Sequence, residues 1–292
     1  MSASNQELDT VARGGHERCE LTLLEASVVH KTVPSEVLIG GYRQTGQGAH
    51  FGIILPPTHR TTPVGAAAPP AVLLLEVVRQ LGIATAHLLL HVPADWVFIA
   101  NSIQFAWAED PVSFPSHGPI ELMAEVEVTN IARRRGVVSR LTAHADIIDL
   151  EGFSVASASG TLSCIPASAY RAIRRNAHLR SSQHTRTDPA MLDVTRRDHE
   201  GLTASIGWDW RDRFQFDHDV DHIPGMVLAA AVVEAYKDLA GGSDPRRMSV
   251  LLHRYAELDT QPTLTAQFAG NGSRVGLTVT QDGNPVVTAD LL

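Results

Sequence analysis

The feature that most constrains the fold of this chain is a long apolar segment that carries polar residues at helical spacing. Residues 71–90 are apolar over a length that suits a membrane span, but they include Glu76, Arg79, Gln80 and His87, each of which is costly in lipid. We therefore interpret this segment as a helix buried inside the protein, and we expect no membrane partner.

A second apolar helix is predicted from Met226 to Leu239, and it aligns with the first without a gap, Pro70 falling on Pro224. Segments rich in β-branched residues surround each helix and predict strands. In the first half they are residues 36–42, 50–55, 97–107, 121–129, 137–148 and 153–165, and in the second half residues 202–210, 249–256, 263–268, 275–281 and 286–291. One long helix wrapped by an antiparallel sheet, made twice, predicts an α+β chain with a tandem, or double, hot-dog fold.

The same pattern predicts the division of the chain. We expect a disordered tail over residues 1–20, a first hot-dog repeat over 21–168, a connector over 169–186 and a second repeat over 187–292. The connector is rich in Arg, Ser and His and is expected to be helical at its start. The two sheets should join edge to edge, because this removes exposed strand edges.

Composition excludes several classes of function. The chain has 24 Lys and Arg against 32 Asp and Glu, a formal net charge of −8, which argues against a protein held to nucleic acid by its phosphates. Cys19 and Cys164 lie far apart and match no zinc spacing, which favours a reducing, cytoplasmic location without disulfides. No phosphate-binding loop or dinucleotide fingerprint occurs, so no cofactor is expected.

The polar residues of the first helix form one stripe. On a helical wheel Glu76, Gln80, His87 and His91 fall within roughly 60° of one another, with Arg79 about 60° to the other side of Glu76. One interpretation is a structural ion pair in the groove between the repeats. The other is a functional site, which we favour because the desolvation of a carboxylate on such an apolar helix calls for a reason. His87 and His91 are expected to be structural or exposed.

The segment just before the second helix holds the other polar cluster, made of Asp217, His218, Asp219, Asp221 and His222. Its spacing fits no well-known ligand geometry, so no metal is predicted. Aspartates here also cap the positive end of the helix dipole, which leaves the two histidines unexplained. At Pro224-Gly225 the glycine lets the backbone approach a ligand, and the helix N–H groups offer donors to an oxyanion or carbonyl.

Three motifs resemble those of a known family. The sequence Asp217-His218, followed by Asp221-His222-Ile223-Pro224-Gly225-Met226, resembles the Asp-His-Pro-x-Asp-His-Val-Pro-Gly-Met signature of the A-factor biosynthesis proteins, the γ-butyrolactone synthases of actinomycetes. Val29-His30-Lys31 with Glu36-Val37-Leu38 resembles the opening block of that family, and Glu76-x-x-Arg79-Gln80 its first helix motif. The resemblance covers most of the chain from about Val29 onward.

The resemblance implies an acyltransferase of γ-butyrolactone signal biosynthesis. A β-ketoacyl group would pass from an acyl-carrier-protein thioester to a hydroxyl of dihydroxyacetone phosphate. This chemistry needs a base, donors for the thioester oxyanion and cations for the phosphate. We assign catalysis to Glu76 as the base, Arg79, His218 and His222, and substrate binding to Gln80, Asp217, Asp221, Pro224 and Gly225. A homodimer is compatible with this assignment.

Two differences from the family pattern occur together. Ala230 and Val233 stand where the second helix of the family carries Glu and Arg, and the loop before the first helix is apolar at residues 64–70. A hot-dog site is typically built from the helix of one unit and the loop of the other. The polar helix of the first repeat and the polar loop of the second therefore predict one composite site and a second, decayed one, to which His59 and Arg60 would belong.

Two alternatives remain open from the residues alone. The first is a hot-dog thioester dehydratase or thioesterase with Glu76 and His218 as the acid and base, because residues 70–80 are also similar to the helix start of hydroxyacyl-thioester dehydratases. The second is a non-catalytic acyl-binding protein, which the losses at Ala230 and Val233 favour.

Overall fold

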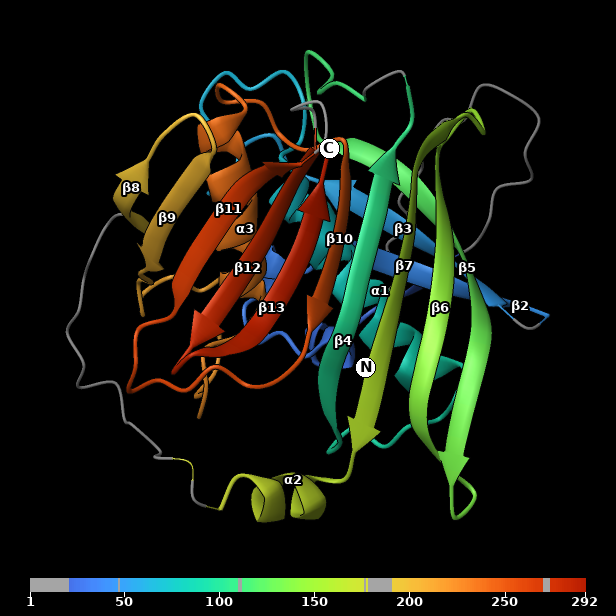
Figure 1. Ribbon diagram of the computed structural model, residues 1–292. Coiled ribbons are helices and arrows are strands. Elements are labelled where there is room, and N and C mark those ends of the chain that lie inside the picture. Colours follow the sequence, from blue (N-terminus) through green and yellow to red (C-terminus); the bar gives the residue numbers. More distant parts are fainter. Residues whose placement is uncertain (1–20, 47, 110–111, 176, 178–190, 270–273) are drawn as a thin grey trace.

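A single antiparallel sheet organises the whole chain. The computed structural model describes residues 21–292 except 47, 110–111, 176, 178–190 and 270–273. Over the described residues the chain forms a sheet of 13 strands with three α-helices (Figure 1). The strand order is β1-β2-β3-β5-β6-β7-β4-β10-β13-β12-β11-β9-β8. The expected tail over 1–20 and the later part of the connector lie outside the described residues.

The first half of the sheet is built from seven of these strands. They are β1 (Thr22–Leu23), β2 (Ile39–Thr45), β3 (Gly48–Leu55), β4 (Val97–Trp107), β5 (Ile120–Arg134), β6 (Val137–Asp149) and β7 (Ser154–Ile165). Two short 3-10 helices, η1 (Ala26–Val29) and η2 (Pro34–Glu36), lie between β1 and β2. The turn between β5 and β6 places Arg135 and Gly136 at positive φ, 53° and 83°.

The second half supplies the remaining strands. They are β8 (Leu192–Arg197), β9 (Gly201–Ile206), β10 (Arg247–Leu252), β11 (Thr263–Ala269), β12 (Arg274–Gln281) and β13 (Asn284–Leu291). The two halves meet where β4 pairs with β10, with Ile103 opposite Val250. The halves therefore share one continuous sheet.

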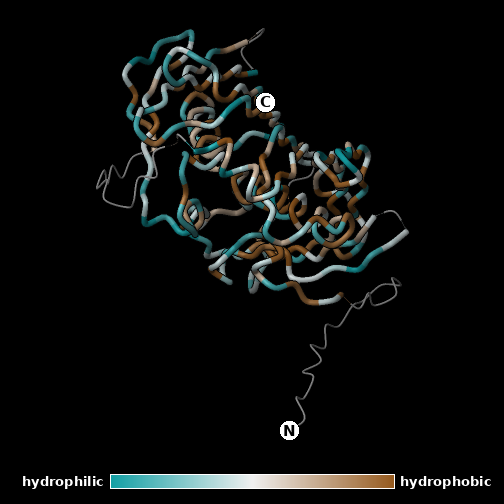
Figure 2. Tube along the Cα trace, turned by 90° about the horizontal axis from the view of Figure 1, so that it is seen from below, coloured by the Kyte–Doolittle hydropathy of each residue, from teal (hydrophilic) through white to brown (hydrophobic). Residues whose placement is uncertain are grey.

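The long helices lie on one face of the sheet and contact each other. They are α1 (Ala71–Leu88) and α3 (Gly225–Leu239), while the short α2 (Ala167–Ile173) lies beyond the ends of the central strands (Figure 1). Both long helices start directly after a proline, Pro70 and Pro224. Viewed from below, hydrophobic stretches gather where these helices lie against the sheet (Figure 2).

Helix α1 is the buried core helix that the sequence predicts. It has the length and hydropathy of a membrane span, but 72% of it is buried within the protein. It ends at Leu88, two residues earlier than predicted, and His91 just beyond it takes a left-handed conformation with φ 53°. A helix that is apolar nearly all round is stable where both sheet and partner helix cover it.

Three strand predictions need correction. The strand predicted over 202–210 ends at Ile206, because the chain turns so that Trp210 packs on Phe216, with ring centroids 4.7 Å apart. The strand predicted over 249–256 ends at Leu252, and Tyr255 turns away to pack against other rings. Strand β8 was not predicted, because it is an edge strand whose side chains are mostly exposed and so lack an apolar alternation.

Candidate functional site

A cavity of about 980 Å³ lies between the two halves of the chain. Its walls come from α1, from β4 and the end of β10, from α2, and from the loop that leads into α3. It is lined by every candidate site residue except Gln80, namely Glu76, Arg79, Asp217, His218, Asp221, His222, Pro224 and Gly225. The helix of the first half and the loop of the second half thus face one cavity.

The centre of the cluster on α1 is the carboxylate of Glu76, whose side chain is fully buried. Arg79 donates to it through Nε and Nη2, at 2.8 and 2.7 Å, and Lys31 Nζ lies 3.3 Å from Oε1. Burial opposes the charge, but Arg79 and then Lys31 outweigh it and lower the pKa of Glu76 below its ordinary value. Glu76 is therefore a carboxylate with both oxygens occupied.

Gln80 lies behind this cluster and ties it to the start of β2. Its amide nitrogen donates to Glu76 Oε1 at 2.8 Å and to the carbonyl of Glu36 at 2.8 Å, and its oxygen accepts from Leu38 N at 2.9 Å. The side chain is fully buried. Gln80 therefore fixes the rotamer of Glu76 without reaching the cavity itself.

Lys31 and Thr32 connect the cluster to the loop of the second half. Lys31 Nζ donates to the carbonyl of Phe214 at 2.9 Å, and the ammonium lies 5.2 Å from the Phe214 ring centroid. Asp217 accepts from Thr32 N at 2.7 Å, and its carbonyl accepts from the Thr32 hydroxyl at 2.7 Å. His218 contacts the other Asp217 oxygen through Nδ1 at 3.1 Å, while most of its ring is exposed.

Asp221 is the centre of a second network that joins the loop to α2. It accepts from the Tyr170 hydroxyl at 2.6 Å, from Arg174 Nε at 3.0 Å and from His222 Nδ1 at 2.6 Å. Burial alone would raise the pKa of Asp221, but these three hydrogen bonds outweigh it and lower the pKa well below its ordinary value. Arg174 continues to Glu257 with two hydrogen bonds, at 2.7 and 2.8 Å.

A pair of histidines lies beside the first cluster. His30 Nε2 and His87 Nε2 are 3.0 Å apart, and both rings contact the ring of Phe98, with centroids 5.2 and 5.0 Å away. His87 Nδ1 lies 2.7 Å from the carbonyl oxygen of Val92. Burial first, and then the charges of His87 and Arg79, lower the pKa of His30 to about 4. His30 is therefore neutral at neutral pH.

The rest of the cavity combines apolar and cationic surface. Ile83, Ile103, Leu162 and Leu228 are among the apolar side chains of its walls. The outer lining includes three exposed arginines that have no ion-pair partner within the described part of the chain: Arg171, Arg175 and Arg254. Exposed Asp95 and Asp219 also line the cavity, so its outer lining holds these three arginines and two aspartates beside the apolar wall.

Gly225 opens helix α3 at the edge of the cavity. A Cβ atom at this position would lie 2.8 Å from Leu252 Cδ2, which is closer than real contacts allow. Glycine therefore fits beside the Leu252 methyl at the end of β10, and Pro224, the N-terminal cap of α3, accepts no side-chain hydrogen bond from the free N–H groups of the helix.

The residues predicted for a second, decayed site do not gather into one cluster in the described structure. Ala230 and Val233 are buried apolar residues of α3. His59 is buried and hydrogen-bonds Glu36 Oε2 at 3.0 Å, and Arg60 forms an ion pair with Asp212. None of these described contacts joins His59 or Arg60 to residues 230–234.

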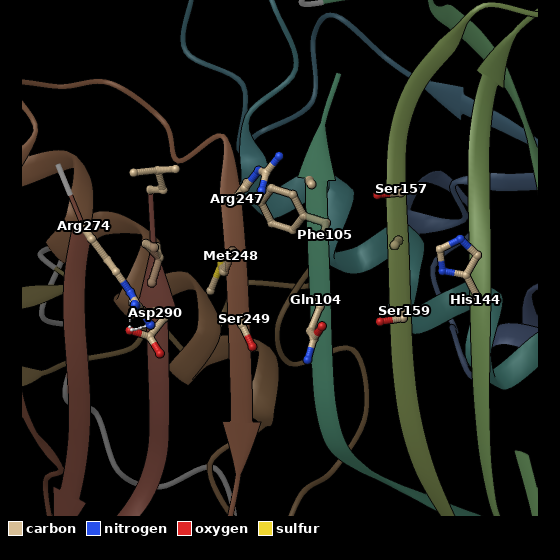
Figure 3. Close-up of a pocket in the computed structure, with 14 residues that line it drawn as sticks. Gln104, Phe105, His144, Ser157, Ser159, Arg247, Met248, Ser249, Arg274 and Asp290 are labelled. Atoms are coloured by element: carbon tan, nitrogen blue, oxygen red, sulfur yellow. Dashed lines mark hydrogen bonds and ion pairs between the residues drawn. The ribbon is translucent and has the colours of Figure 1, made fainter. Parts of the chain in front are cut away.

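A second hollow, of about 520 Å³, lies on the outer face of the sheet over the seam between β4 and β10. Figure 3 shows its polar lining, including Gln104, Ser249 and His144, and the ion pair between Arg274 and Asp290. Within the described residues no group of three His, Cys, Asp or Glu side chains is arranged to hold a metal ion.

Several cavity residues were not assigned a role from the sequence. Lys31 and His30 appeared only within the opening block of the family resemblance, and Tyr170 and Arg174 were placed in the connector. Lys31 belongs to the motif Val29-His30-Lys31, which is the only sequence signal for it. Its partner Glu76 is 45 positions away in the sequence, so local spacing does not indicate their contact. For His87 the sequence predicts a structural or exposed residue, and the structure places it half-buried against His30.

Comparison of the sequence with known proteins gives two matches. The model of the family described as A-factor biosynthesis hotdog domain (AfsA) matches residues 16–166. A curated protein of Streptomyces virginiae, 2-oxo-3-(phosphooxy)propyl 3-oxoalkanoate synthase, is 26% identical over 286 aligned residues, covering 89% of this chain and 93% of that protein.

Comparison of the structure gives thioesterases of the hot-dog type. An acyl-ACP thioesterase from Bacteroides thetaiotaomicron superposes with a TM-score of 0.54 at 11% identity, covering 84% of this chain and 97% of that one. The 12:0-ACP thioesterase from Umbellularia californica gives 0.53 at 11% identity, covering 85% and 98%. At these identities the likeness concerns the fold, and it confirms the hot-dog fold predicted from the sequence.

Proposed function

Because the chain belongs to the A-factor biosynthesis hotdog family, we propose that it transfers a β-ketoacyl group from an acyl-carrier-protein thioester to a hydroxyl of dihydroxyacetone phosphate. The name of the Streptomyces relative describes an ester of this kind. One observation supports the proposal most: a single cavity between the halves combines an apolar wall, cations and neutral or exposed histidines.

The acyl chain fits the apolar wall. A volume of about 980 Å³ is at the upper end of ordinary ligand pockets, which suits a substrate as long as a β-ketoacyl pantetheine. Ile83 of α1 and Leu228 of α3 contribute from the two halves, and Ile103 and Leu162 contribute from the sheet. Burial of the chain against these residues supplies binding free energy without a specific polar contact.

Arg79 is the proposed contact for the phosphate of the hydroxyketone. Its Nε and Nη2 donate hydrogen bonds to Glu76, but Nη1 has no hydrogen-bond partner within the described residues. The Arg79 side chain is 19% exposed. In this arrangement Glu76 is a counter-ion that fixes Arg79 rather than the base, since its lowered pKa and occupied oxygens leave it little capacity to accept a proton. A fixed guanidinium recognises phosphate well.

The carrier protein is proposed to approach the exposed arginines Arg171, Arg175 and Arg254 at the mouth. Their positive charge complements an acidic carrier and the phosphate of its pantetheine arm. His218 and the free N–H groups near Gly225 are the proposed donors to the thioester oxygen. Asp217, Asp221 and His222 hold the loop through the hydrogen bonds described above.

The decisive experiment mixes purified protein with a β-ketoacyl carrier protein and dihydroxyacetone phosphate, and detects products by mass spectrometry. We expect the phosphorylated ester and free carrier thiol. Release of the free β-keto acid without ester would instead identify a thioesterase, and binding of an unchanged thioester would identify an acyl-binding protein.

The proposed role of Arg79 has a matched control in the same chain. Arg79→Gln should abolish the preference for dihydroxyacetone phosphate over unphosphorylated dihydroxyacetone, while Arg60→Gln, whose side chain pairs with Asp212 and does not line the cavity, should keep it. Equal preferences in both variants would reject Arg79 as the phosphate contact.

A further inference from the structure

The backbone at His30 is held in an unusual conformation. His30 follows η1 with φ 54° and ψ 47°, the left-handed region, which residues other than glycine enter at a cost. Its N–H donates to the carbonyl of Ser27 at 3.2 Å, and the next residue, Lys31, donates to Ala26 at 2.9 Å. In this conformation the ring of His30 packs against both His87 and Phe98 and lines the cavity.

The hydrogen bonds of the pair fix where its protons lie. The carbonyl of Val92 can only accept, so His87 Nδ1 carries a proton and donates it. In the tautomer that carries its proton on Nδ1, His87 Nε2 is an acceptor, and the contact of 3.0 Å then requires His30 Nε2 to carry the proton between them. Neutral His30 therefore keeps an unprotonated Nδ1.

That nitrogen is available to a ligand. His30 Nδ1 has no hydrogen-bond partner within the described part of the chain. It also does not belong to the unpartnered side-chain atoms that are fully buried there. The charged and titratable groups that act on the ring are His87 and Arg79 of α1, together with His218 and Asp217 of the loop before α3. The bare nitrogen thus lies where the first half of the chain meets the second.

We propose that His30 Nδ1 is the group that takes the proton from the attacking hydroxyl, with His87 as the positioning residue that holds His30 in the required tautomer. This inference rests on the proposed acyl transfer. It replaces Glu76 as the base, because the oxygens of Glu76 are occupied by Arg79, Lys31 and Gln80.

The step balances without any further reactant. The hydroxyl proton of dihydroxyacetone phosphate moves to His30 Nδ1 while its oxygen forms a bond to the thioester carbon, and the carbonyl electron pair moves to the carbonyl oxygen. When the carbonyl re-forms, the carbon–sulfur bond breaks and its electron pair leaves with the sulfur. The imidazolium of His30 then returns the proton to the thiolate, which leaves as the carrier thiol.

A phosphate dianion bound at Arg79 would strengthen this base. Arg79 is one of the cations that lower the pKa of His30, so neutralising it raises that pKa from about 4 towards the working range of a general base. A general base of this type contributes about 10²–10⁴-fold to a rate.

The kinetic test uses His30→Gln and the ester-forming assay. We expect kcat to fall by about 10²–10⁴-fold, with the KM for the thioester and the thermal midpoint nearly unchanged. His87→Leu should also lower kcat and change the pH–rate profile, whereas His87→Gln, whose amide oxygen can still accept from His30, should restore part of the rate. His144→Gln, on the outer face of the sheet, is the matched control and should behave as the unmodified protein.

Two results would overturn the inference separately from the function. If the unmodified protein forms ester and His30→Gln keeps its rate, then His30 is not the base although the acyl transfer stands. Nitrogen-15 NMR of the resting protein tests the tautomer without any turnover: we expect His30 protonated at Nε2 and bare at Nδ1, and the opposite tautomer would reject the assignment. Absence of ester from the unmodified protein would reject the proposed function itself.

Discussion

Removal of the charge of Glu76 should destabilise the protein more than any comparable change at its surface. Glu76→Gln leaves Arg79 and Lys31, whose side chains are 19% and 4% exposed, without their counter-ion. Breaking a buried pair by removing one partner costs about 3–5 kcal/mol, which is a large part of an ordinary stability of about 5–15 kcal/mol. The measurement is equilibrium unfolding in urea, followed by tryptophan fluorescence.

The matched control is Glu257→Gln. Glu257 also accepts two hydrogen bonds from an arginine, but its side chain is 39% exposed and Arg174 keeps Asp221 as a partner. Solvent screening reduces its contribution, so we expect a loss of about 1 kcal/mol or less. A loss below about 1 kcal/mol for Glu76→Gln as well would refute the argument that burial makes the difference.

The pH dependence gives the same argument a second readout. The folded pKa of Glu76 is below its unfolded value of 4.5, so its contribution to stability is fully present above pH 4.5 and is lost as the pH falls through the folded pKa. Glu76→Gln should therefore flatten the loss of stability below pH 4.5. Replacing Lys31, Glu76 and Arg79 together by Met should be less destabilising than Glu76→Gln alone, because no unpaired charge remains.

Three further predictions concern other contacts. The thiol of Cys164 is buried, which raises its pKa to about 11, so iodoacetamide at pH 8 should leave it unmodified in the folded protein, as peptide mapping would show. Gly225→Ala should lower the stability by about 1 kcal/mol or less, because its Cβ meets only the terminal methyl of the flexible Leu252 side chain, and calorimetry showing a larger loss would contradict this. Tyr170→Phe removes a 2.6 Å hydrogen bond to the Asp221 carboxylate and should cost about 1.5–3 kcal/mol in urea unfolding, less if water replaces the hydroxyl.

The fold could be predicted because its signals are local. Pro70 and Pro224 mark the starts of two apolar helices, and the strands after them alternate or are rich in β-branched residues. The prediction was wrong at Trp210 and Tyr255, where aromatic side chains leave the sheet to pack on other rings. Propensity alone favours a strand at such residues, and tertiary packing decides otherwise.

The contacts of the site could be predicted from the sequence only where the two contacting residues are close along the chain. Glu76 and Arg79 are one helical turn apart, so their pairing follows from spacing. His30 and His87 are 57 positions apart, and nothing local indicates that they meet. The direction of the His30 ring depends on a left-handed backbone residue, which propensity does not predict for histidine at that position.

The pairing of β4 with β10 also has a consequence for how the chain is synthesised. Strand β4 already pairs with β7 when Ile165 has emerged, but its other edge stays open until Leu252 is made. At about 5–20 residues per second this interval lasts roughly 4–17 s during synthesis. During that time the nascent chain presents an unpaired edge next to Ile103 and Phe105, a surface on which another nascent chain can add a strand. The yield of folded protein should therefore depend on chaperone capacity during translation more than on the stability of the finished sheet.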